Sequence, residues 1–204
     1  MPIDYKKTQK ELYQPKTTPS IIDVPEMMYI AVDGNGNPNT SVEYSTAIEA
    51  LYGLSYAIKM GNKSVLEYVV PPLEGFWWSQ AGITIDYVNK DNFCWTAVIR
   101  QPEFVTADVF ESAKITLAKK KPALDTLKVR LIKITEGMFV QVMHVGSYDD
   151  EPATIIEMER YAAKNGYEID IKNNRRHHEI YLSDPRKVAP EKLKTVIRHP
   201  VKKV

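Results

Sequence analysis

The sequence predicts an α+β fold made of two tandem β-α-β-β modules, whose strands form a mainly antiparallel sheet with helices on one face and a ligand groove at the module junction. In each half of the chain, an apolar strand-like run precedes a segment with helical periodicity. Each half then closes on a strand that ends in two polar residues and a proline, "VIRQP" in the first half and "YLSDP" in the second. Because the order of the elements and the polar residues and proline that end the last strand agree between the halves, we interpret residues 21–104 and 128–185 as pseudo-repeat modules.

The first module contains one well-bounded helix and three strand-like runs. The helix is predicted over 40–61, where Thr40 and Glu43 form a capping-box pair and Gly61 provides a left-handed stop. The polar turn "DGNGNPN" separates this helix from the strand before it. The predicted strands cover residues 27–32, 64–70 and 93–99.

The second module repeats this order after a linking helix at 106–120. Pro152 lies in the first turn of its helix and Gly166 follows the last turn. The predicted strands cover residues 137–148, 167–172 and 178–182. Beyond the module, Leu193 and Ile197 recur at helical spacing, so we predict a C-terminal helix over 189–198.

A length of 204 residues suits one large domain or two small modules, and we expect one domain that covers residues 1–204. The net charge of +1 gives no electrostatic reason to expect binding to nucleic acid or to a membrane. No apolar run resembles a signal peptide or a membrane-spanning helix, and the single cysteine, Cys94, excludes an internal disulfide. We therefore expect a cytoplasmic protein, and the sequence leaves open whether it forms a homodimer.

Five motifs, in the same order along the chain, resemble the GyrI-like small-molecule-binding domain family. They are "DYKKTQKELY" (4–13), "VDGNGNPN" (32–39), "PPLEGFWW" (71–78), "WTAVIRQPEFVT" (95–106) and "HEIYLSDPRKVAPEKLKTVIRHPV" (178–201). The resemblance covers essentially the whole chain and points to the stand-alone members of about this length. It implies the tandem fold derived above, a pair of SHS2-like modules, and ligands that are flat, hydrophobic and often cationic. In this family, aromatic rings surround a glutamate on the last strand, and the matching position here is Glu179.

The tryptophan-rich motifs are similar to a subfamily of stand-alone hydrolases, the cyclopropanoid cyclopropane hydrolases. The resemblance implies an enzyme that opens the activated cyclopropane of DNA-alkylating natural products in an aromatic cage and so protects the cell. Some other relatives are effector domains of transcription activators, but the first twenty residues are too few for a helix-turn-helix arm. A binding protein that sequesters cationic drugs without turnover, or a module that senses effectors, remains the alternative.

Glu179 and Tyr181 are the predicted catalytic residues. They lie two apart on "HEIYL" and so share one face of a strand, while Ile180 and Leu182 share the other. We expect the apolar pair to pack on the helices and the polar pair to face the groove. An ordinary sheet with one solvent-exposed face would explain the same pattern.

The candidate cage residues are mostly aromatic. Trp77 and Trp78 are adjacent, so their rings point to opposite sides of a strand, and we expect Trp78 in particular to line the groove. The remaining candidates are Phe76, Trp95, His144 and Tyr148. If "IRQP" aligns with "LSDP", Trp95 faces the helices instead.

No metal or other cofactor is expected. His177 and His178 are adjacent on a strand, so they point opposite ways and cannot chelate one ion in regular geometry. Opening a strained cyclopropane by water needs a slot for the flat ligand, a base for the water and a donor to the developing phenolate. Glu179 is our candidate for the base, and Tyr181 or Tyr148 for the donor.

Overall fold

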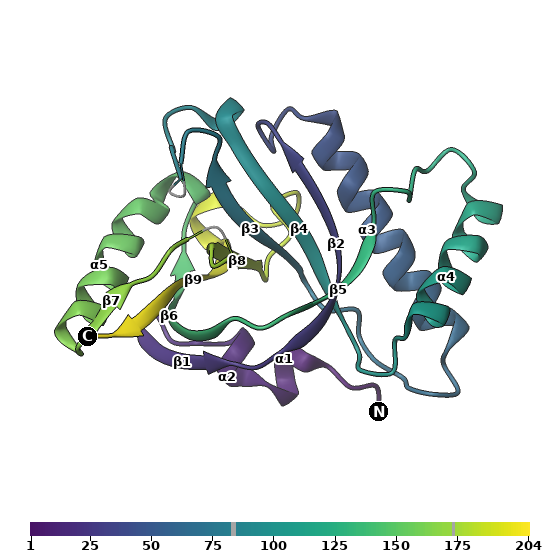
Figure 1. Ribbon diagram of the computed structural model, residues 1–204, viewed down its shortest axis with the longest axis horizontal. Coiled ribbons are helices and arrows are strands. Elements are labelled where there is room, and N and C mark those ends of the chain that lie inside the picture. Colours follow the sequence, from purple (N-terminus) through teal and green to yellow (C-terminus); the bar gives the residue numbers. More distant parts are fainter. Residues whose placement is uncertain (83–84, 173) are drawn as a thin grey trace.

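A computed structural model describes residues 1–82, 85–172 and 174–204, and its centre is one antiparallel sheet of nine strands (Figure 1). The strand order is β1-β6-β9-β8-β3-β4-β2-β5, with β7 paired to β9. The strands are β1 (Ser20–Val24), β2 (Met27–Asn35), β3 (Leu73–Ser79), β4 (Phe93–Gln101), β5 (Arg130–Ile134), β6 (Gly137–Val145), β7 (Tyr167–Ile169), β8 (His177–Tyr181) and β9 (Lys194–Lys203). The helices are α1 (Tyr5–Thr8), α2 (Lys10–Tyr13), α3 (Val42–Gly61), α4 (Ala107–Lys120) and α5 (Glu151–Lys164).

The strand order reads alike in both directions from the central β3–β8 pair. On one side it continues through β4, β2 and β5, and on the other through β9, β6 and β1. Helix α3 follows β2 in the chain, and α5 follows β6, the strand at the matching place. The α+β fold with an antiparallel sheet, predicted from the sequence, is therefore confirmed.

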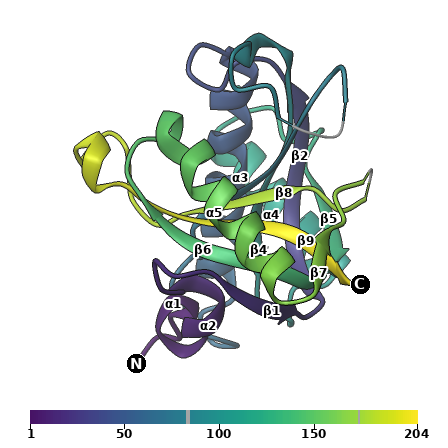
Figure 2. The ribbon, with the colours of Figure 1, turned by 90° about the vertical axis from the view of Figure 1, so that its left-hand side faces the viewer.

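The three long helices lie on one face of the sheet. Helices α3 and α4 pack on the right-hand half in Figure 1, and α5 packs on the left-hand half. The N-terminal helices α1 and α2 lie below the sheet in Figures 1 and 2, and residues of α2 pack on its other face. The centre of the helix face, where β3 meets β8, thus lies between α3 and α5.

The ends of the helices follow local capping chemistry. Helix α3 begins after Ser41, whose hydroxyl accepts a hydrogen bond from the Tyr44 amide, so the cap lies one residue beyond the Thr40 that we predicted. Leu51, Leu54 and the other apolar residues of its buried face pack on the sheet. Helix α4 begins after Thr106, which caps the Val109 amide as the predicted linking helix requires.

Two predicted elements are wrong. Residues 64–70 form no strand, because only Tyr68 makes an isolated bridge there, and the second strand of the first module is β3 instead. The predicted C-terminal helix over 189–198 is replaced by β9, which pairs with β6, β7 and β8. The apolar spacing around Val196 fits a strand that is buried on both faces as well as it fits a helix. In the strand order, β4 with "VIRQP" occupies the place that matches β9, which carries "VIRHP", and not the place of "YLSDP".

The face opposite the long helices is closed by the N-terminal segment. Leu12 and Tyr13 of α2 pack against Phe76, Ile180 and further apolar residues of the sheet. This segment is also held by the sheet's polar side chains. The Arg198 guanidinium donates to the Leu12 carbonyl oxygen at 2.6 Å, and the Gln141 amide donates to the Glu11 carbonyl oxygen at 2.8 Å.

A buried ionic cluster lies beneath that segment. The two ring nitrogens of His178 are 2.8 Å from Glu136 Oε2 and 3.0 Å from Glu74 Oε2, and Arg198 Nη1 is 3.5 Å from Glu136 Oε1. Burial alone would lower the pKa of His178, but the Glu136 and Glu74 carboxylates raise it to about 9. Burial likewise opposes the charge of Glu136, yet His178 and Arg198 hold its pKa below the usual value. The imidazole is therefore charged at neutral pH, and it ties β8 to Glu74 on β3 and to Glu136 in the turn between β5 and β6.

Candidate functional site

Glu179 lies at the centre of the sheet, on the face that carries the long helices. Its register partners are Gly75 on β3 and Ile197 on β9, and Ile197 packs in the core beneath α5. We expected Ile180 to pack on the helices and Glu179 to face away from them, and this is wrong. Ile180 packs against the N-terminal segment, which leaves the space between α3 and α5 for Glu179.

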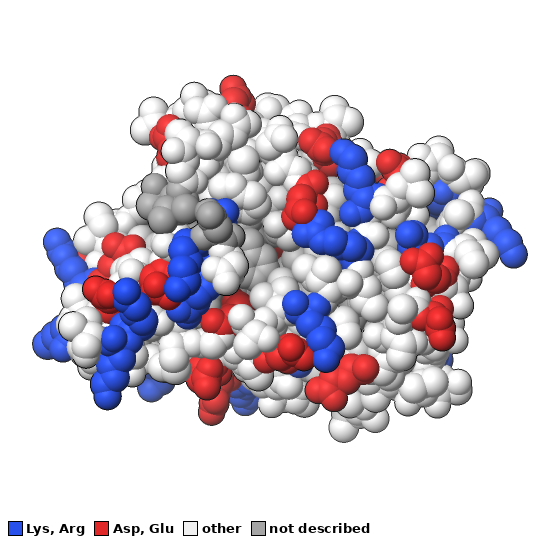
Figure 3. Space-filling view, in the orientation of Figure 1, with Lys and Arg blue, Asp and Glu red and all other residues white. Residues whose placement is uncertain are grey.

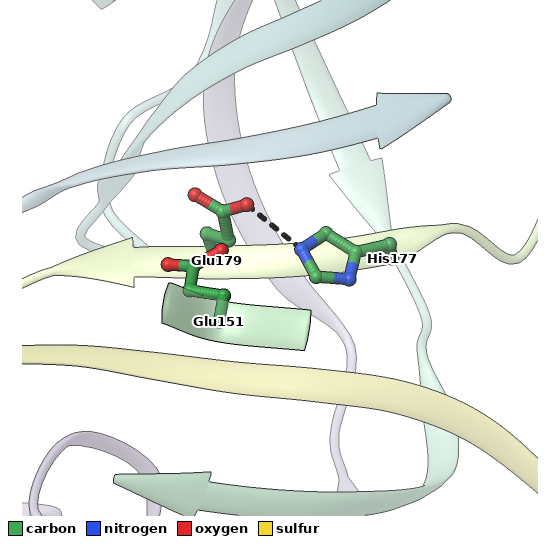
Figure 4. Close-up of side chains that lie close together, drawn as sticks. All are labelled: Glu151, His177 and Glu179. Atoms are coloured by element: carbon green, nitrogen blue, oxygen red, sulfur yellow. Dashed lines mark hydrogen bonds and ion pairs between the residues drawn. The ribbon is translucent and has the colours of Figure 1, made fainter. Parts of the chain in front are cut away.

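Glu179 is one of three buried polar side chains that meet there. Glu151, the first residue of α5, and His177 on β8 lie beside it, as Figure 4 shows. His177 Nε2 is 2.8 Å from Glu179 Oε1. Glu179 is 7% exposed and Glu151 only 1%. The site therefore holds two carboxyl groups in a nearly dry place.

The two carboxyl groups are driven to opposite protonation states. Burial and the charge of Glu179 raise the pKa of Glu151 well above its usual value. Burial also opposes the charge of Glu179, but the hydrogen bond and the charge of His177, together with Tyr181 and Glu151, lower its pKa overall. Glu179 is thus the base of the pair and Glu151 the acid, a division of roles that suits proton-transfer catalysis.

Aromatic rings cover the pair on the α3 side. Trp77 Nε1 donates to the Tyr181 hydroxyl at 2.8 Å, and the Tyr44 ring lies 5.7 Å from Trp77 and 4.9 Å from Trp95, centroid to centroid. The Tyr148 ring meets Tyr181 edge-on at 5.8 Å. Burial, followed by the charges of Glu179 and Glu151, raises the pKa of Tyr148 to about 12. Burial, followed by the charge of Glu179, raises the pKa of Tyr181 well above its usual value too, so both tyrosine hydroxyls are protonated and able to donate at neutral pH.

Gly75 makes this arrangement of rings possible. A Cβ atom at this position would lie 2.6 Å from Trp77 Nε1 and 3.1 Å from the Tyr181 hydroxyl oxygen. Real Cβ atoms do not approach so closely, so only glycine lets the indole and the phenol meet across the β3–β8 pair.

The structure brings together some of the predicted site residues but not all of them. Trp77, Trp95, Tyr148 and Tyr181 surround Glu179 or pack on its neighbours. Trp78, which we preferred for the groove, lies on the opposite face of β3, where the Arg176 guanidinium is 4.5 Å from its ring centroid. Its neighbour Trp77 lies on the face of Glu179, where we expected Trp78.

Phe76 and His144 also lie outside the cluster around Glu179. Phe76 stacks on His178 at 4.1 Å on the face of the N-terminal segment. His144 uses both ring nitrogens locally, at 2.8 Å from Thr154 Oγ1 and 2.9 Å from the Ser147 carbonyl oxygen. It therefore holds the turn before α5, the turn that carries Tyr148, and its nitrogens are not directed at a ligand.

Sequence reasoning missed four residues near the pair: Glu151, Glu159, His199 and Tyr87. The first signal available was an acidic residue in the first turn of a helix that starts beside the junction. His199 was hidden because the sequence predicted that part of the chain to lie outside the sheet. Tyr87 belongs to the segment after β3, and its buried hydroxyl has no hydrogen-bond partner among the described residues.

Glu151, His177 and Glu179 also have the spacing of metal ligands, with one ligand atom from each within 4.8 Å of the others. The hydrogen bonds explain the same spacing without an ion. His177 Nε2 bonds Glu179, and its Nδ1 lies 2.7 Å from His199 Nε2, so both ring nitrogens already have partners. We therefore assign the cluster as a proton-sharing group, and the absence of a metal remains a prediction.

Charged side chains of both signs are mixed on one face of the molecule, the face seen in Figure 3. Two surface hollows lie away from Glu179, one between α3 and α4 and the other beside α2 and β1. No helix in the described part of the chain is both long and apolar enough to cross a membrane.

Comparison with known proteins places these residues in a family. The model of the family described as "GyrI-like small molecule binding domain" matches residues 17–202. Against the curated proteins, no match was found.

Three solved structures from Listeria innocua are similar over nearly the whole chain. An uncharacterized conserved protein is 47% identical with a TM-score of 0.93, covering 98% of this chain and 100% of its own. A hydrolase is 45% identical with a TM-score of 0.90 and the same coverage. A hydrolase encoded by lin2189 is 45% identical with a TM-score of 0.92, covering 99% of this chain and 100% of its own.

Proposed function

The chain belongs to the family of GyrI-like small molecule binding domains, and from this premise we propose that it is a hydrolase that opens the activated cyclopropane of flat, hydrophobic, DNA-alkylating compounds. One observation carries the proposal: Glu179 and Glu151, whose pKa values are shifted in opposite directions, share a buried site beside packed aromatic rings. The similarity to two proteins named hydrolases, each 45% identical, supports an enzymatic role.

The aromatic rings are suited to hold a flat ligand. Tyr148 and Tyr181 are only partly buried, so their rings offer the ligand a surface beside Glu179. Each good ring contact contributes about 0.5–1.5 kcal/mol beyond area burial. The rings pack against one another in this structure, and a ligand is admitted when Tyr148 swings outward from Tyr181.

The reaction needs one base and one acid. Glu179 takes a proton from water, whose oxygen bonds the cyclopropane carbon while a carbon–carbon bond of the ring breaks. The electron pair of that bond moves into the conjugated dienone, which becomes a phenolate. Tyr148 or Tyr181 donates a hydrogen bond to the developing oxyanion, and Glu151 supplies the proton that it finally takes up. The pair then holds as many protons as it did before the reaction.

Binding without turnover is the second candidate, and the charge of the site favours it for one class of ligand. With Glu151 protonated and Glu179 ionised, the pair carries a single buried negative charge beside electron-rich ring faces. Such a site attracts a planar monocation by charge and by ring quadrupole together. Under this candidate the protein sequesters cationic compounds.

A turnover assay separates the two candidates. The purified protein is incubated with a cyclopropane-bearing alkylator, and the ring-opened product is followed by mass spectrometry. We expect product to form faster than in buffer, and the Glu179→Gln variant to lose about 100-fold or more of the rate. If the alkylator disappears no faster than in buffer while a planar cation binds tightly, sequestration is the correct function.

A further inference from the structure

The hydroxyl group of Tyr87 is buried without a hydrogen-bond partner among the described residues. A buried hydroxyl that makes no hydrogen bond lowers the stability of the fold, and phenylalanine would fill the same space without that cost. Tyr68 has a hydroxyl of the same kind within the described part of the chain, so an unpartnered oxygen does not by itself mark a site. Tyr87 differs from Tyr68 in its surroundings.

Tyr87 packs beside the buried carboxyl pair, on the α5 side. Its side chain lies against the apolar cluster that contains Ile155 and Ile197. Ile197 is the register partner of Glu179, and Ile155 follows Glu151 by about one turn of α5. The rings of Trp77 and its neighbours cover the pair from the α3 side, so Tyr87 contributes an aromatic ring to the opposite side of the site.

The segment that carries Tyr87 is fixed on both sides of this residue. The Asp86 amide donates to Ser79 Oγ at 2.7 Å. The Lys90 ammonium pairs with the Asp149 carboxylate in the turn before α5. These two contacts hold the connection between β3 and β4 against the start of α5, so the position of the Tyr87 ring is set before a ligand binds.

The charges of the site orient the Tyr87 hydroxyl. Burial, followed by the charges of Glu179, Glu151 and Glu159, raises the pKa of Tyr87, so the phenol keeps its proton at neutral pH. Glu179 acts more strongly than the other two, which indicates that the hydroxyl end of the ring faces the pair. An O–H dipole in this field turns its proton toward the carboxylate and its lone pairs away from it. The oxygen is therefore better placed to accept a hydrogen bond from a ligand than to donate one.

We propose that Tyr87 is a specificity-determining residue of the ligand site, and that its hydroxyl oxygen accepts a hydrogen bond from an N–H group on the edge of a flat aromatic ligand. The inference rests on the ligand site proposed above and names the class of compound that this site prefers. The charge of Glu179 favours the same edge, because the hydrogen of an N–H group carries a positive partial charge. An ether oxygen at that edge would instead turn its lone pairs toward those of Tyr87.

The test compares two flat tricyclic compounds of the same shape. Carbazole carries an N–H group where dibenzofuran carries an ether oxygen, so the two differ in one hydrogen-bond donor. Protein is added to each compound at low micromolar concentration, and binding is followed by the fluorescence of the compound. We expect the wild type to bind carbazole about tenfold more tightly than dibenzofuran, the effect of one hydrogen bond. Tyr87→Phe should bind the two compounds alike, chiefly because it binds carbazole more weakly.

Tyr68→Phe is the matched control. It also removes a buried and unpartnered hydroxyl, but from a different part of the fold, where Tyr68 forms a bridge with Ile3 and packs on Phe104. This variant should keep the wild-type preference for carbazole. The melting temperature of each variant should equal or exceed that of the wild type, since neither hydroxyl is bonded within the protein.

Four outcomes would overturn the inference. Tyr87→Phe keeps the preference for carbazole, the wild type binds both compounds alike, the wild type binds neither, or Tyr87→Phe melts at a lower temperature because its hydroxyl was already bonded. Failure of the hydrolase function is seen separately in the turnover assay. If the alkylator persists as in buffer while the carbazole preference is present and Tyr87→Phe abolishes it, the enzymatic role falls and the role of Tyr87 stands.

Discussion

The buried imidazole on the face away from the site gives a quantitative prediction about stability. His178 contacts two carboxylates at 2.8 and 3.0 Å, and its pKa is raised from 6.5 to about 9. That difference corresponds to about 3 kcal/mol of folding free energy. Because the pKa is raised in the folded state, this contribution is fully present below pH 6.5 and is lost as the pH rises through about 9.

The perturbation is His178→Gln, which keeps a hydrogen-bonding side chain but cannot titrate. Near pH 6 we expect the free energy of unfolding of the variant to be about 3–5 kcal/mol lower than that of the wild type, because the variant leaves buried carboxylates without a cation. Between pH 6.5 and 9.5 the wild type should lose up to about 3 kcal/mol relative to the variant, so the gap narrows. In the wild type Glu136 does not interfere, since His178 and Arg198 lower its pKa and so place its own transition in acid.

Urea unfolding, followed by tryptophan fluorescence at several pH values, measures both quantities. A gap between wild type and His178→Gln that stays constant from pH 6 to pH 9.5 would refute the reasoning. A gap that widens with pH would refute it as well, because the imidazole would then be stabilising in its neutral form.

Three further predictions concern the site. Trp77→Leu should weaken the binding of a flat aromatic ligand by about tenfold, while Trp78→Leu on the opposite face changes it little, as fluorescence titration would show. Gly75→Ala should lower the free energy of unfolding by about 1–3 kcal/mol and also weaken binding, because its Cβ displaces the Trp77 indole; an unchanged melting temperature would contradict this. The rate of turnover should rise with pH as Glu179 ionises, at a pKa below the usual value of a glutamate. It should fall only when Glu151 loses its proton, at a pKa well above that usual value. A pH–rate profile with a single rising limb near pH 7 would contradict this assignment.

Most of the fold could be predicted from local signals. Helix α4 follows from the cap at Thr106, and α5 follows from Pro152 and Gly166, because these signals act within one turn of chain. The strand β9 could not be separated from a helix in this way. Its residues from Thr195 to Val201 are buried on both faces, so the two-residue alternation that marks a half-exposed strand is absent.

The site was predicted less completely, because its face depends on tertiary structure. Alternation along β8 correctly separates Glu179 and Tyr181 from Ile180, but it does not say which side the helices cover. That choice is made by the N-terminal segment, whose Tyr13 packs against the other face. Glu151 and His199 reach the site from elements that are distant from β8 in sequence, so no spacing rule could bring them together.

The source of the oxygen atom in the product tests the central claim most directly. A single turnover of a cyclopropane-bearing alkylator in H₂¹⁸O should give a ring-opened product with one ¹⁸O atom, formed by the wild type and not by Glu179→Gln. Product without ¹⁸O, or a covalent adduct between ligand and protein, would show that Glu179 does not activate water.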